Sequence, residues 1–468
     1  MQVQIAGFNI DKSLIDKLDT ELATPEVISA AYARISRSSK DVTELRTEAM
    51  EELAKARASN DRIIFEMGHS SIAEHAVFNI DIIGISRVLA ELIQSVRLAS
   101  FTEKSQRYVT LDEDFVIPKE LDDPKLDWFK KRYIAYSKQL FAEYQKTYDK
   151  LLVYYKKKFP KLNQRELEGK AKEDARYILP MSTKTQMGIT INARSLENLL
   201  RKLYHSPLLE AKELYDLLFT EVSKISPSLI RYTESTGLKP KLRSINKSLP
   251  IWKEQLDVDK PLKVVSFTPD PDELILAALL TEELYYGIED IKELIYDMSW
   301  DEQDKLWRDV FEGIQSWHKM PRAFELCVFC FEIIMSESCW AQFKRHRIGT
   351  IIKEDEVYEP SHFYQEAIRK VKRTEIWETQ IEKVHYFRDQ LSFHNEEAAR
   401  YIRMNTDTVK ILAQFNLREI YHFVRLRSDD HAQAEIRNIS DLMRTYVRVF
   451  APFASRYLCG KSEFCIND

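Results

Sequence analysis

The residues best suited to bind a substrate gather in one short segment near residue 105. Residues 103–107 read EKSQR and offer a carboxylate, a hydroxyl, an amide and an arginine as Glu103, Ser105, Gln106 and Arg107. An arginine presents a planar fork of N–H donors that matches a phosphate group, and a nearby hydroxyl on a turn completes a cradle. The segment therefore predicts a site for a nucleoside monophosphate.

Two segments look like incomplete copies of one motif. Residues 96–108 read VRLASFTEKSQRY, and residues 342–350 read QFKRHRIGT. Together they resemble the signature R-H-R-x-x-S-x-N-E-x-S-x-R-Y of the flavin-dependent thymidylate synthases, also called thymidylate synthase complementing proteins. The first copy has Ser95 and Val96 where the signature has its first arginine and its histidine, and Thr102 where it has asparagine.

The second copy has lost the opposite part of the signature. Residues 352–357, IKEDEV, stand where the family has N-E-x-S-x-R. Asp355 at the serine position would repel a phosphate, and Val357 removes the arginine. We therefore expect this half of the chain to lack the phosphate-binding loop.

Further matches strengthen the resemblance. Residues 416–437 match N-x-R-x-x-x-H-F-x-x-L-R-x-x-x-H-A-Q-x-E-I-R, and Arg427 falls on the arginine that in the family binds the uracil ring and favours its ionisation at N3. Leu203 stands at the equivalent place in the first half. Residues 33–36 and 68–75 match the blocks A-R-x-S and G-H-x-[ST]-x-x-E-H. Without the resemblance, these residues would also suit solvated helices with local caps and ion pairs.

The family builds each nucleotide site from more than one subunit. One subunit supplies the glutamine, the first arginine of R-H-R and the late arginine, and its partner supplies the E-x-S-x-R loop and an A-R-x-x-L-P arginine. The resemblance therefore implies one composite dUMP site per chain, in a homodimer that imitates a tetramer of single domains. It assigns to dUMP the residues Gln342, Arg345, Glu103, Ser105, Gln106, Arg107, Arg176 and Arg427. The catalytic candidates among them are Arg427, Arg345 and Ser105.

The resemblance also implies reductive methylation of dUMP to dTMP. FAD would carry the hydride, NADPH would be the reductant and methylenetetrahydrofolate the carbon donor. The implied FAD ligands are Ser36, His69, Ser71, Glu103, Arg345, His346, Arg347, Asn192, Arg194, Asn198, Asn416, Arg418 and His422. Whether Asn192 with Arg194, or Asn416 with Arg418, faces the productive flavin stays open, and no metal site is expected.

An internal repeat must position these groups. DARYI at 174–178 matches AARYI at 398–402, and NARSL at 192–196 matches NLREI at 416–420 with the same separation. We expect one repeat at 1–243, with a long helical insert near 120–172, then a linker at 244–263 and a second repeat at 264–468. The resemblance covers most of both halves, apart from the linker and the insert.

The secondary-structure patterns predict an α+β fold with a mainly antiparallel sheet flanked by helices in each repeat. Helices are expected at 41–58, 195–203, 208–224, 419–427 and 430–449, and strands at 76–82, 262–267 and 327–334. In the insert, aromatic and leucine residues recur every three or four positions: Phe129, Tyr133, Tyr136, Leu140, Tyr144, Tyr148, Leu151 and Tyr155. This stripe predicts one long packed helix; a surface that stacks nucleic-acid bases is the alternative.

Composition narrows the class of protein. With 468 residues and a net charge of -5, the chain suits two globular domains and argues against a protein that coats nucleic acid. The five cysteines form no disulfide framework, and Cys327 and Cys330, in the apolar run 324–331, predict buried thiols rather than a zinc site. The first residues do not resemble a signal peptide and no apolar run has membrane-spanning length, so we expect a cytoplasmic protein.

Two other functions stay open from the sequence. The departures at Ser95, Val96 and Thr102 also suit an inactive homologue that binds flavin or nucleotide. The lysine- and tyrosine-rich insert also suits a flavoenzyme that modifies another pyrimidine, such as uridine in RNA.

Overall fold

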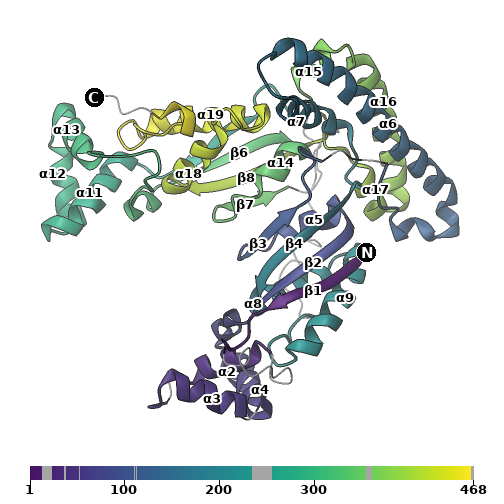
Figure 1. Ribbon diagram of the computed structural model, residues 1–468. Coiled ribbons are helices and arrows are strands. Elements are labelled where there is room, and N and C mark those ends of the chain that lie inside the picture. The colour runs from purple at the N-terminus through teal and green to yellow at the C-terminus, as the bar shows by residue number, and fades with distance from the viewer. Residues whose placement is uncertain are drawn as a thin grey trace. The chain divides into compact units, whose positions relative to one another are not determined.

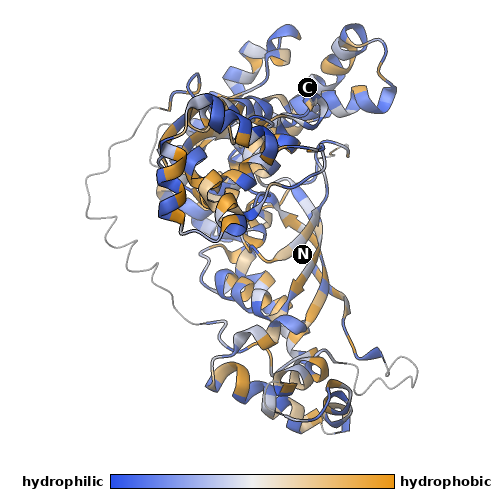
Figure 2. Ribbon diagram, turned by 90° about the vertical axis from the view of Figure 1, so that its left-hand side faces the viewer, coloured by the Kyte–Doolittle hydropathy of each residue, from blue (hydrophilic) through white to orange (hydrophobic). Residues whose placement is uncertain are grey.

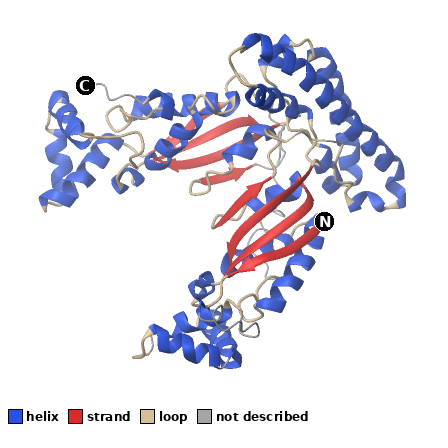
Figure 3. Cartoon of the chain, in the orientation of Figure 1, coloured by secondary structure: helices blue, strands red, loops and turns tan. Residues whose placement is uncertain are grey.

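The computed structural model describes residues 1–12, 24–35, 38–51, 53–109, 111, 113–234, 256–354 and 361–464. The chain divides into two compact units: unit 1 comprises Met1–Pro250 and Val371–Met404, and unit 2 comprises Ile251–Lys370 and Asn405–Asp468. Each unit contains a four-stranded antiparallel sheet with helices packed around it, which confirms the predicted α+β class (Figure 3). The predicted repeat boundaries stay a prediction, and most of the expected linker lies outside the described residues.

The sheet of unit 1 has the strand order β1-β2-β4-β3. Its strands are β1 (Gln2–Phe8), β2 (Val77–Ser86), β4 (Lys184–Asn192) and β3 (Ala99–Glu103). β2 and β4 pair along their whole length in the centre, where Ile80 lies opposite Ile189. β2 contains the predicted strand 76–82. Gly84 has a φ of 77° at an irregularity of β2, a conformation that glycine adopts without the strain that a side chain would add.

Unit 1 also contains the following helices (Figure 1). They are α2 (Glu26–Ile35), α3 (Val42–Glu51), α4 (Leu53–Asp61), α5 (Arg87–Gln94), α6 (Asp127–Lys158), α7 (Gln164–Ala175), α8 (Ala193–Tyr204), α9 (Leu209–Ile225), α16 (Thr374–His394) and α17 (Glu396–Ile402). α8 contacts β4, and α9 contacts β1. The helices predicted at 195–203 and 208–224 are thus confirmed, whereas the one expected at 41–58 is divided into α3 and α4.

The sheet of unit 2 repeats this order as β5-β6-β8-β7. Its strands are β5 (Leu262–Phe267), β6 (Val328–Ser336), β8 (Thr408–Asn416) and β7 (Thr350–Lys353). The predicted strand at 262–267 has the observed bounds, and β6 lies within one or two residues of the strand predicted at 327–334.

The helices of unit 2 are α11 (Pro271–Leu284), α12 (Ile288–Tyr296), α13 (Trp300–Val310), α14 (Glu337–Phe343), α15 (Glu366–Lys370), α18 (Leu417–Arg427) and α19 (Ala434–Phe450). α18 contacts β8, and α19 contacts β5, so both helices expected in this half are present. α11, α12 and α13 were not predicted from the sequence. Figure 2 shows the hydrophobic residues running along the strands of the sheets.

The predicted helix in the insert is confirmed as α6. Its residues Tyr133, Leu140, Tyr144, Leu151 and Tyr155 are buried. α16 packs against α6, where Glu143 accepts hydrogen bonds from Arg373 Nε at 2.8 Å and from Trp377 Nε1 at 3.1 Å. Because much of the stripe is buried within unit 1, it stabilises that unit and offers few aromatic faces to nucleic-acid bases.

The same polar anchors recur in both units. In unit 1, Glu210 accepts hydrogen bonds from the backbone N–H and hydroxyl of Ser86 at 2.8 and 2.6 Å. In unit 2, Glu435 does the same for Ser336 at 2.7 and 2.6 Å. Each serine also caps the N-terminus of the helix that follows. The carboxylates therefore fix the start of α5 and α14, the helices that lead into the candidate site.

We predict that Glu435→Ala destabilises unit 2 by about 2–4 kcal/mol, because it leaves two donors of Ser336 buried without an acceptor. Urea unfolding followed by circular dichroism measures this loss. The control is Glu293→Ala, whose side chain is exposed on α12 and whose unfolding midpoint should not change. Equal midpoints for both variants would contradict the proposed anchoring role.

The hydrophobic core of unit 2 contains the two central strands. Phe329, Phe331, Ile411 and Phe415 are buried in it, and so is Cys327, whose environment raises the pKa of its thiol to about 12, chiefly by burial. Cys330 is buried as well. Both cysteines are thus buried thiols, as expected. No described helix combines the length and apolar composition needed to cross a lipid bilayer.

Candidate functional site

The segment 103–107 lies at the end of the short edge strand of unit 1. Glu103 is the last residue of β3, and its carboxylate accepts a hydrogen bond from Gln94 Nε2 at 2.8 Å. The Ser105 hydroxyl then accepts the backbone N–H of Arg107 at 3.2 Å, which closes a turn. The strand end and this turn hold the predicted cradle residues close together.

Arg107 in this turn interacts electrostatically with Arg176. Arg107 Nε lies 2.5 Å from a carboxylate oxygen of Glu173 on α7. Arg176 begins the 3-10 turn Arg176–Ile178 after α7 and is buried. Burial lowers the pKa of Arg176, Glu173 raises it, and Arg87 and Arg107 lower it further. The three guanidinium groups therefore lie near one another.

Gln106 connects the turn to a residue that we did not predict from the sequence. Its Oε1 accepts a hydrogen bond from Arg87, the first residue of α5, and both side chains are buried. Arg87 lies outside every family block, so only the tertiary contact identifies it. We call Glu103, Ser105, Gln106, Arg107 and Arg176 the N-terminal wall.

The second set of candidates gathers in unit 2, where α14 ends and α18 ends. Arg427, the last residue of α18, donates from Nε to His346 Nε2 at 3.0 Å and from a terminal nitrogen to the Gln342 carbonyl at 3.4 Å. The structure thus brings together residues that are 81 positions apart. We call Gln342, Arg345, His346, Arg347 and Arg427 the C-terminal wall.

His346 is held as a neutral imidazole. Its ring packs edge-on against Phe423, with centroids 4.6 Å apart, and Nε2 accepts the hydrogen bond from Arg427. Burial lowers the pKa of His346 to about 3, and the charges of Arg427 and His422 contribute in the same direction. With Nε2 accepting, the ring proton is on Nδ1.

The lowered pKa of His346 predicts a loss of stability in acid. Below the ordinary pKa of about 6.5 the unfolded chain binds a proton that the folded state excludes, so stability falls as the pH drops from 6.5 towards 3. The slope contributed by this residue is at most about 1.4 kcal/mol per pH unit. His346→Gln keeps an acceptor for Arg427 but does not titrate, so it should lose less stability than the wild type between pH 7.5 and pH 5 in urea unfolding.

The control for this measurement is His431→Gln, because His431 is exposed. Its pH dependence should match that of the wild type. Parallel stability curves for wild type and His346→Gln would contradict a buried, neutral imidazole.

The other members of the C-terminal wall differ in exposure. Gln342 is buried and its amide donates to Oε1 of Gln433. Arg345 is exposed, and among the described residues its side chain has no hydrogen bond or ion pair. Burial, and then the charge of Arg345, lower the pKa of Arg347. The wall therefore presents one unpaired cation, Arg345, beside a rigid pair formed by His346 and Arg427.

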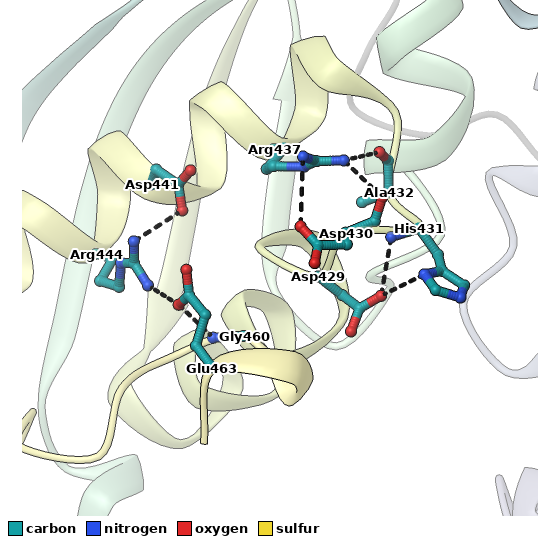
Figure 4. Close-up of polar contacts among 9 residues, drawn as sticks. All are labelled: Asp429, Asp430, His431, Ala432, Arg437, Asp441, Arg444, Gly460 and Glu463. Carbon is teal, nitrogen blue, oxygen red and sulfur yellow. Dashed lines mark hydrogen bonds and ion pairs between the residues drawn. The ribbon is translucent and has the colours of Figure 1, made fainter. Parts of the chain in front are cut away.

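The loop after Arg427 is fixed by a set of ion pairs and backbone contacts (Figure 4). Arg437 donates to the carbonyls of Asp430 and Ala432 at 2.7 and 2.8 Å, and the backbone N–H of His431 donates to Asp429 at 3.0 Å. His431, Ala432 and Arg437 belong to the H-A-Q-x-E-I-R part of the sequence match, and Asp429 and Asp430 come directly before it. They hold the connection between α18 and α19, and so the end of the helix that carries Arg427.

The FAD candidates fall into two groups. His69, Ser71 and His422 are exposed, while Ser36 lies outside the described residues. Asn192 and Asn416 cap α8 and α18, Arg194 pairs with Glu74, and Arg418 pairs with Glu325 at 2.7 Å and donates to the Met320 carbonyl. Asn198 accepts a hydrogen bond from Arg201 at 3.0 Å. In both halves the asparagine therefore caps a helix and the arginine pairs with a glutamate.

A cavity lies beside the A-R-x-S block in unit 1. Its volume is about 210 Å³, and Arg34, Ser38 and Lys40 are among its lining residues. Glu48 also lines the cavity and pairs with Lys40, so the Arg34 guanidinium and the Ser38 hydroxyl are its remaining donor groups.

In unit 2, the residues that correspond to Glu103 and Arg87 form an ion pair with each other. Lys353 ends β7 as Glu103 ends β3, and its Nζ lies 2.9 and 3.0 Å from the carboxylate oxygens of Glu337. Glu337 begins α14 as Arg87 begins α5. Both signs of charge are thus reversed relative to unit 1.

The amino-acid sequence is similar to those of known proteins. A family model described as thymidylate synthase complementing protein matches residues 14–228 and 263–453. The flavin-dependent thymidylate synthase of Clostridium tetani is 31% identical over 217 residues, which cover 45% of this chain and 82% of that protein. A UPF0159 protein of Chlamydia muridarum is 24% identical over 435 residues, 87% of this chain and 81% of that protein.

Among solved structures, a similar one is flavin-dependent thymidylate synthase ThyX from Helicobacter pylori complexed with FAD and dUMP. It is 20% identical with a TM-score of 0.32, and the match covers 49% of this chain and 100% of that chain.

Proposed function

Because the chain belongs to the thymidylate synthase complementing protein family, we propose that it is a flavin-dependent thymidylate synthase acting on dUMP. In the proposed reaction, the methylene of methylenetetrahydrofolate is bonded to C5 of dUMP and reduced by a hydride from FADH2. The products are dTMP, tetrahydrofolate and FAD, and NADPH regenerates the reduced flavin. The observation that carries the proposal is that the N-terminal and C-terminal walls keep complementary parts of the family signature.

We propose that the two halves are copies of one domain and that their walls jointly form the dUMP site. Arg107 and Arg176 would bind the 5′-phosphate, and the Ser105 hydroxyl would donate a further hydrogen bond. Arg427 would bind the uracil ring and stabilise the negative charge that develops there. The contacts to His346 and Gln342 restrict the guanidinium to one orientation, so little reorganisation is needed when charge develops.

The residues present suit FAD by their chemistry. The exposed, unpaired Arg345 provides a cation for its diphosphate, and Arg347 is a second one nearby. The exposed side chains of His69, Ser71 and His422 offer hydrogen-bonding groups. The cavity lined by Arg34 offers a concave surface. Bound reduced FAD supplies the hydride; the protein orients the ring of dUMP, and its arginines stabilise the anionic form.

The composite site predicts one dUMP per chain in a homodimer. Equilibrium dialysis with labelled dUMP, together with flavin absorbance per chain, measures this stoichiometry. One dUMP per chain supports the proposal, and two equivalent sites or none would contradict it.

The loss of the signature asparagine, replaced by exposed Thr102, keeps an inactive flavin- or nucleotide-binding homologue as the second candidate. A dUMP-dependent tritium-release assay separates the two. Release of tritium from C5 supports the enzyme, whereas a flavin spectrum and dUMP binding without release support the inactive homologue.

A further inference from the structure

Arg87 is a buried charge that the proposed function has not yet used. It begins α5 directly after the cap residue Ser86, and its guanidinium donates to Gln106 of the N-terminal wall. We propose, on the basis of the proposed function, that Arg87 is a further phosphate-binding residue. Through it, the N-terminal wall selects a nucleoside 5′-monophosphate over the unphosphorylated nucleoside.

The first support is the accumulation of positive charge. Arg87 and Arg176 are buried, and both Arg87 and Arg107 act on Arg176 electrostatically. Glu173 and Asp174 both interact electrostatically with Arg176, and Glu173 also pairs with Arg107. Asp174 accepts a hydrogen bond from Tyr155, and burial raises the pKa of Asp174 to about 7, so it carries only part of a charge near neutral pH.

Among the described residues, Arg87 has no carboxylate partner, and its side-chain hydrogen bond goes to a neutral amide. Buried cations are costly unless an anion compensates them. A phosphate monoester carries nearly two negative charges at neutral pH, since its second pKa is about 6. It would compensate the charge of Arg87 better than a carboxylate, which carries one charge, or a neutral nucleoside.

The second support comes from the other half of the chain. At the start of α14, Glu337 occupies the place of Arg87, and at the end of β7, Lys353 occupies the place of Glu103. The two side chains pair with each other, and Glu337 is almost fully buried. Where the phosphate-binding loop has been replaced, the position of Arg87 thus carries the opposite charge and is neutralised from within the protein.

The orientation of Arg87 is set by a neutral partner. The Gln106 amide oxygen accepts one N–H without cancelling the charge, so the cation stays effective toward a bound anion. A carboxylate at position 106 would have formed a closed ion pair of the kind seen between Lys353 and Glu337. This arrangement makes Arg87 a positioned donor rather than one half of a structural salt bridge.

The experiment measures the affinity of the full chain for dUMP, deoxyuridine and inorganic phosphate. Arg87→Gln removes the charge but keeps an amide that can contact Gln106. We expect it to weaken dUMP binding about 10- to 30-fold, the loss of one charge-assisted hydrogen bond, and to leave deoxyuridine binding unchanged. Arg87→Lys, which keeps the charge but not the fork, should recover part of the affinity. The control Arg132→Gln, on the surface of α6, should bind all three ligands like the wild type.

Inorganic phosphate, followed by 31P line broadening, separates this inference from the proposed function. If phosphate binds the wild type and is weakened by Arg87→Gln while dUMP binds no better than phosphate, the phosphate site stands and the thymidylate synthase proposal fails. If Arg87→Gln retains the melting temperature of the wild type and binds dUMP and phosphate equally well, the inference is overturned. Equal weakening of dUMP and deoxyuridine would also overturn it, because the effect would then not be on the phosphate.

Discussion

Replacing Arg427 with leucine is expected to lower the rate of dTMP formation about 1,000-fold, the upper range for removing one donor that stabilises a developing anion. In the proposed site this guanidinium is the group that stabilises charge on the uracil ring. The equivalent residue of the other half is Leu203, which is fully buried, so the fold tolerates an apolar side chain at this helix position. The measurement is single-turnover formation of dTMP.

The control for Arg427→Leu is Arg425→Leu, two residues earlier on the same helix. Arg425 donates to the His318 carbonyl and, among the described residues, makes no hydrogen bond or ion pair with the C-terminal wall, so its loss should leave the rate near that of the wild type. A second readout is the pKa of His346 by NMR, which should rise when the neighbouring charge of Arg427 is removed. Unchanged turnover in Arg427→Leu would remove this arginine from the proposed mechanism.

Replacing Arg107 with alanine is expected to weaken dUMP binding about 100-fold, because a charged hydrogen-bonding partner of the phosphate is lost. The substitution also releases Glu173 from its ion pair, and this carboxylate would then repel the phosphate. Isothermal titration with dUMP measures the change. The effect exceeds that expected for Arg87 because the signature arginine loses both its own donors and the neutralisation of Glu173.

The matched control is Arg400→Ala, since Arg400 corresponds to Arg176 in the repeat. Arg400 lies on the surface of α17 and pairs with Glu396 at 3.0 Å, four residues earlier on the same helix. Its loss should not change dUMP affinity. If Arg400→Ala weakened binding as strongly as Arg107→Ala, two nucleotide sites per chain would be indicated and the composite site would be wrong.

The elements with strong local patterns were predictable. β5 is a short segment rich in β-forming residues and has the predicted bounds, and the aromatic stripe of α6 repeats at helical spacing. Asn192 and Asn416 begin α8 and α18 because an asparagine side chain accepts the free N–H groups of the first turn. In contrast, α11, α12 and α13 were missed, and α3 and α4 were predicted as one helix.

The candidate site was predictable as a set of residues through the family resemblance, but not as a set of contacts. The sequence does not reveal that Arg427 donates to His346, that Gln433 accepts from Gln342, or that Glu173 pairs with Arg107. No sequence motif includes Arg87. Only its contact with Gln106, and the presence of Glu337 at the corresponding position of unit 2, identify it as a candidate.

The sequence by itself determined the family, the α+β class and the residues that each half has kept or lost, because helix and strand periodicity and motif spacing are local properties of the chain. Only the tertiary structure decided that 371–404 packs within unit 1, where Arg373 and Trp377 meet Glu143 more than 200 residues away. It also decided which charges are closed by an ion pair, as Lys353 and Glu337 are, and which buried charge is held by a neutral side chain, as Arg87 is by Gln106. The physical reason is that the cost of burying a charge depends on partners that packing brings from distant parts of the chain.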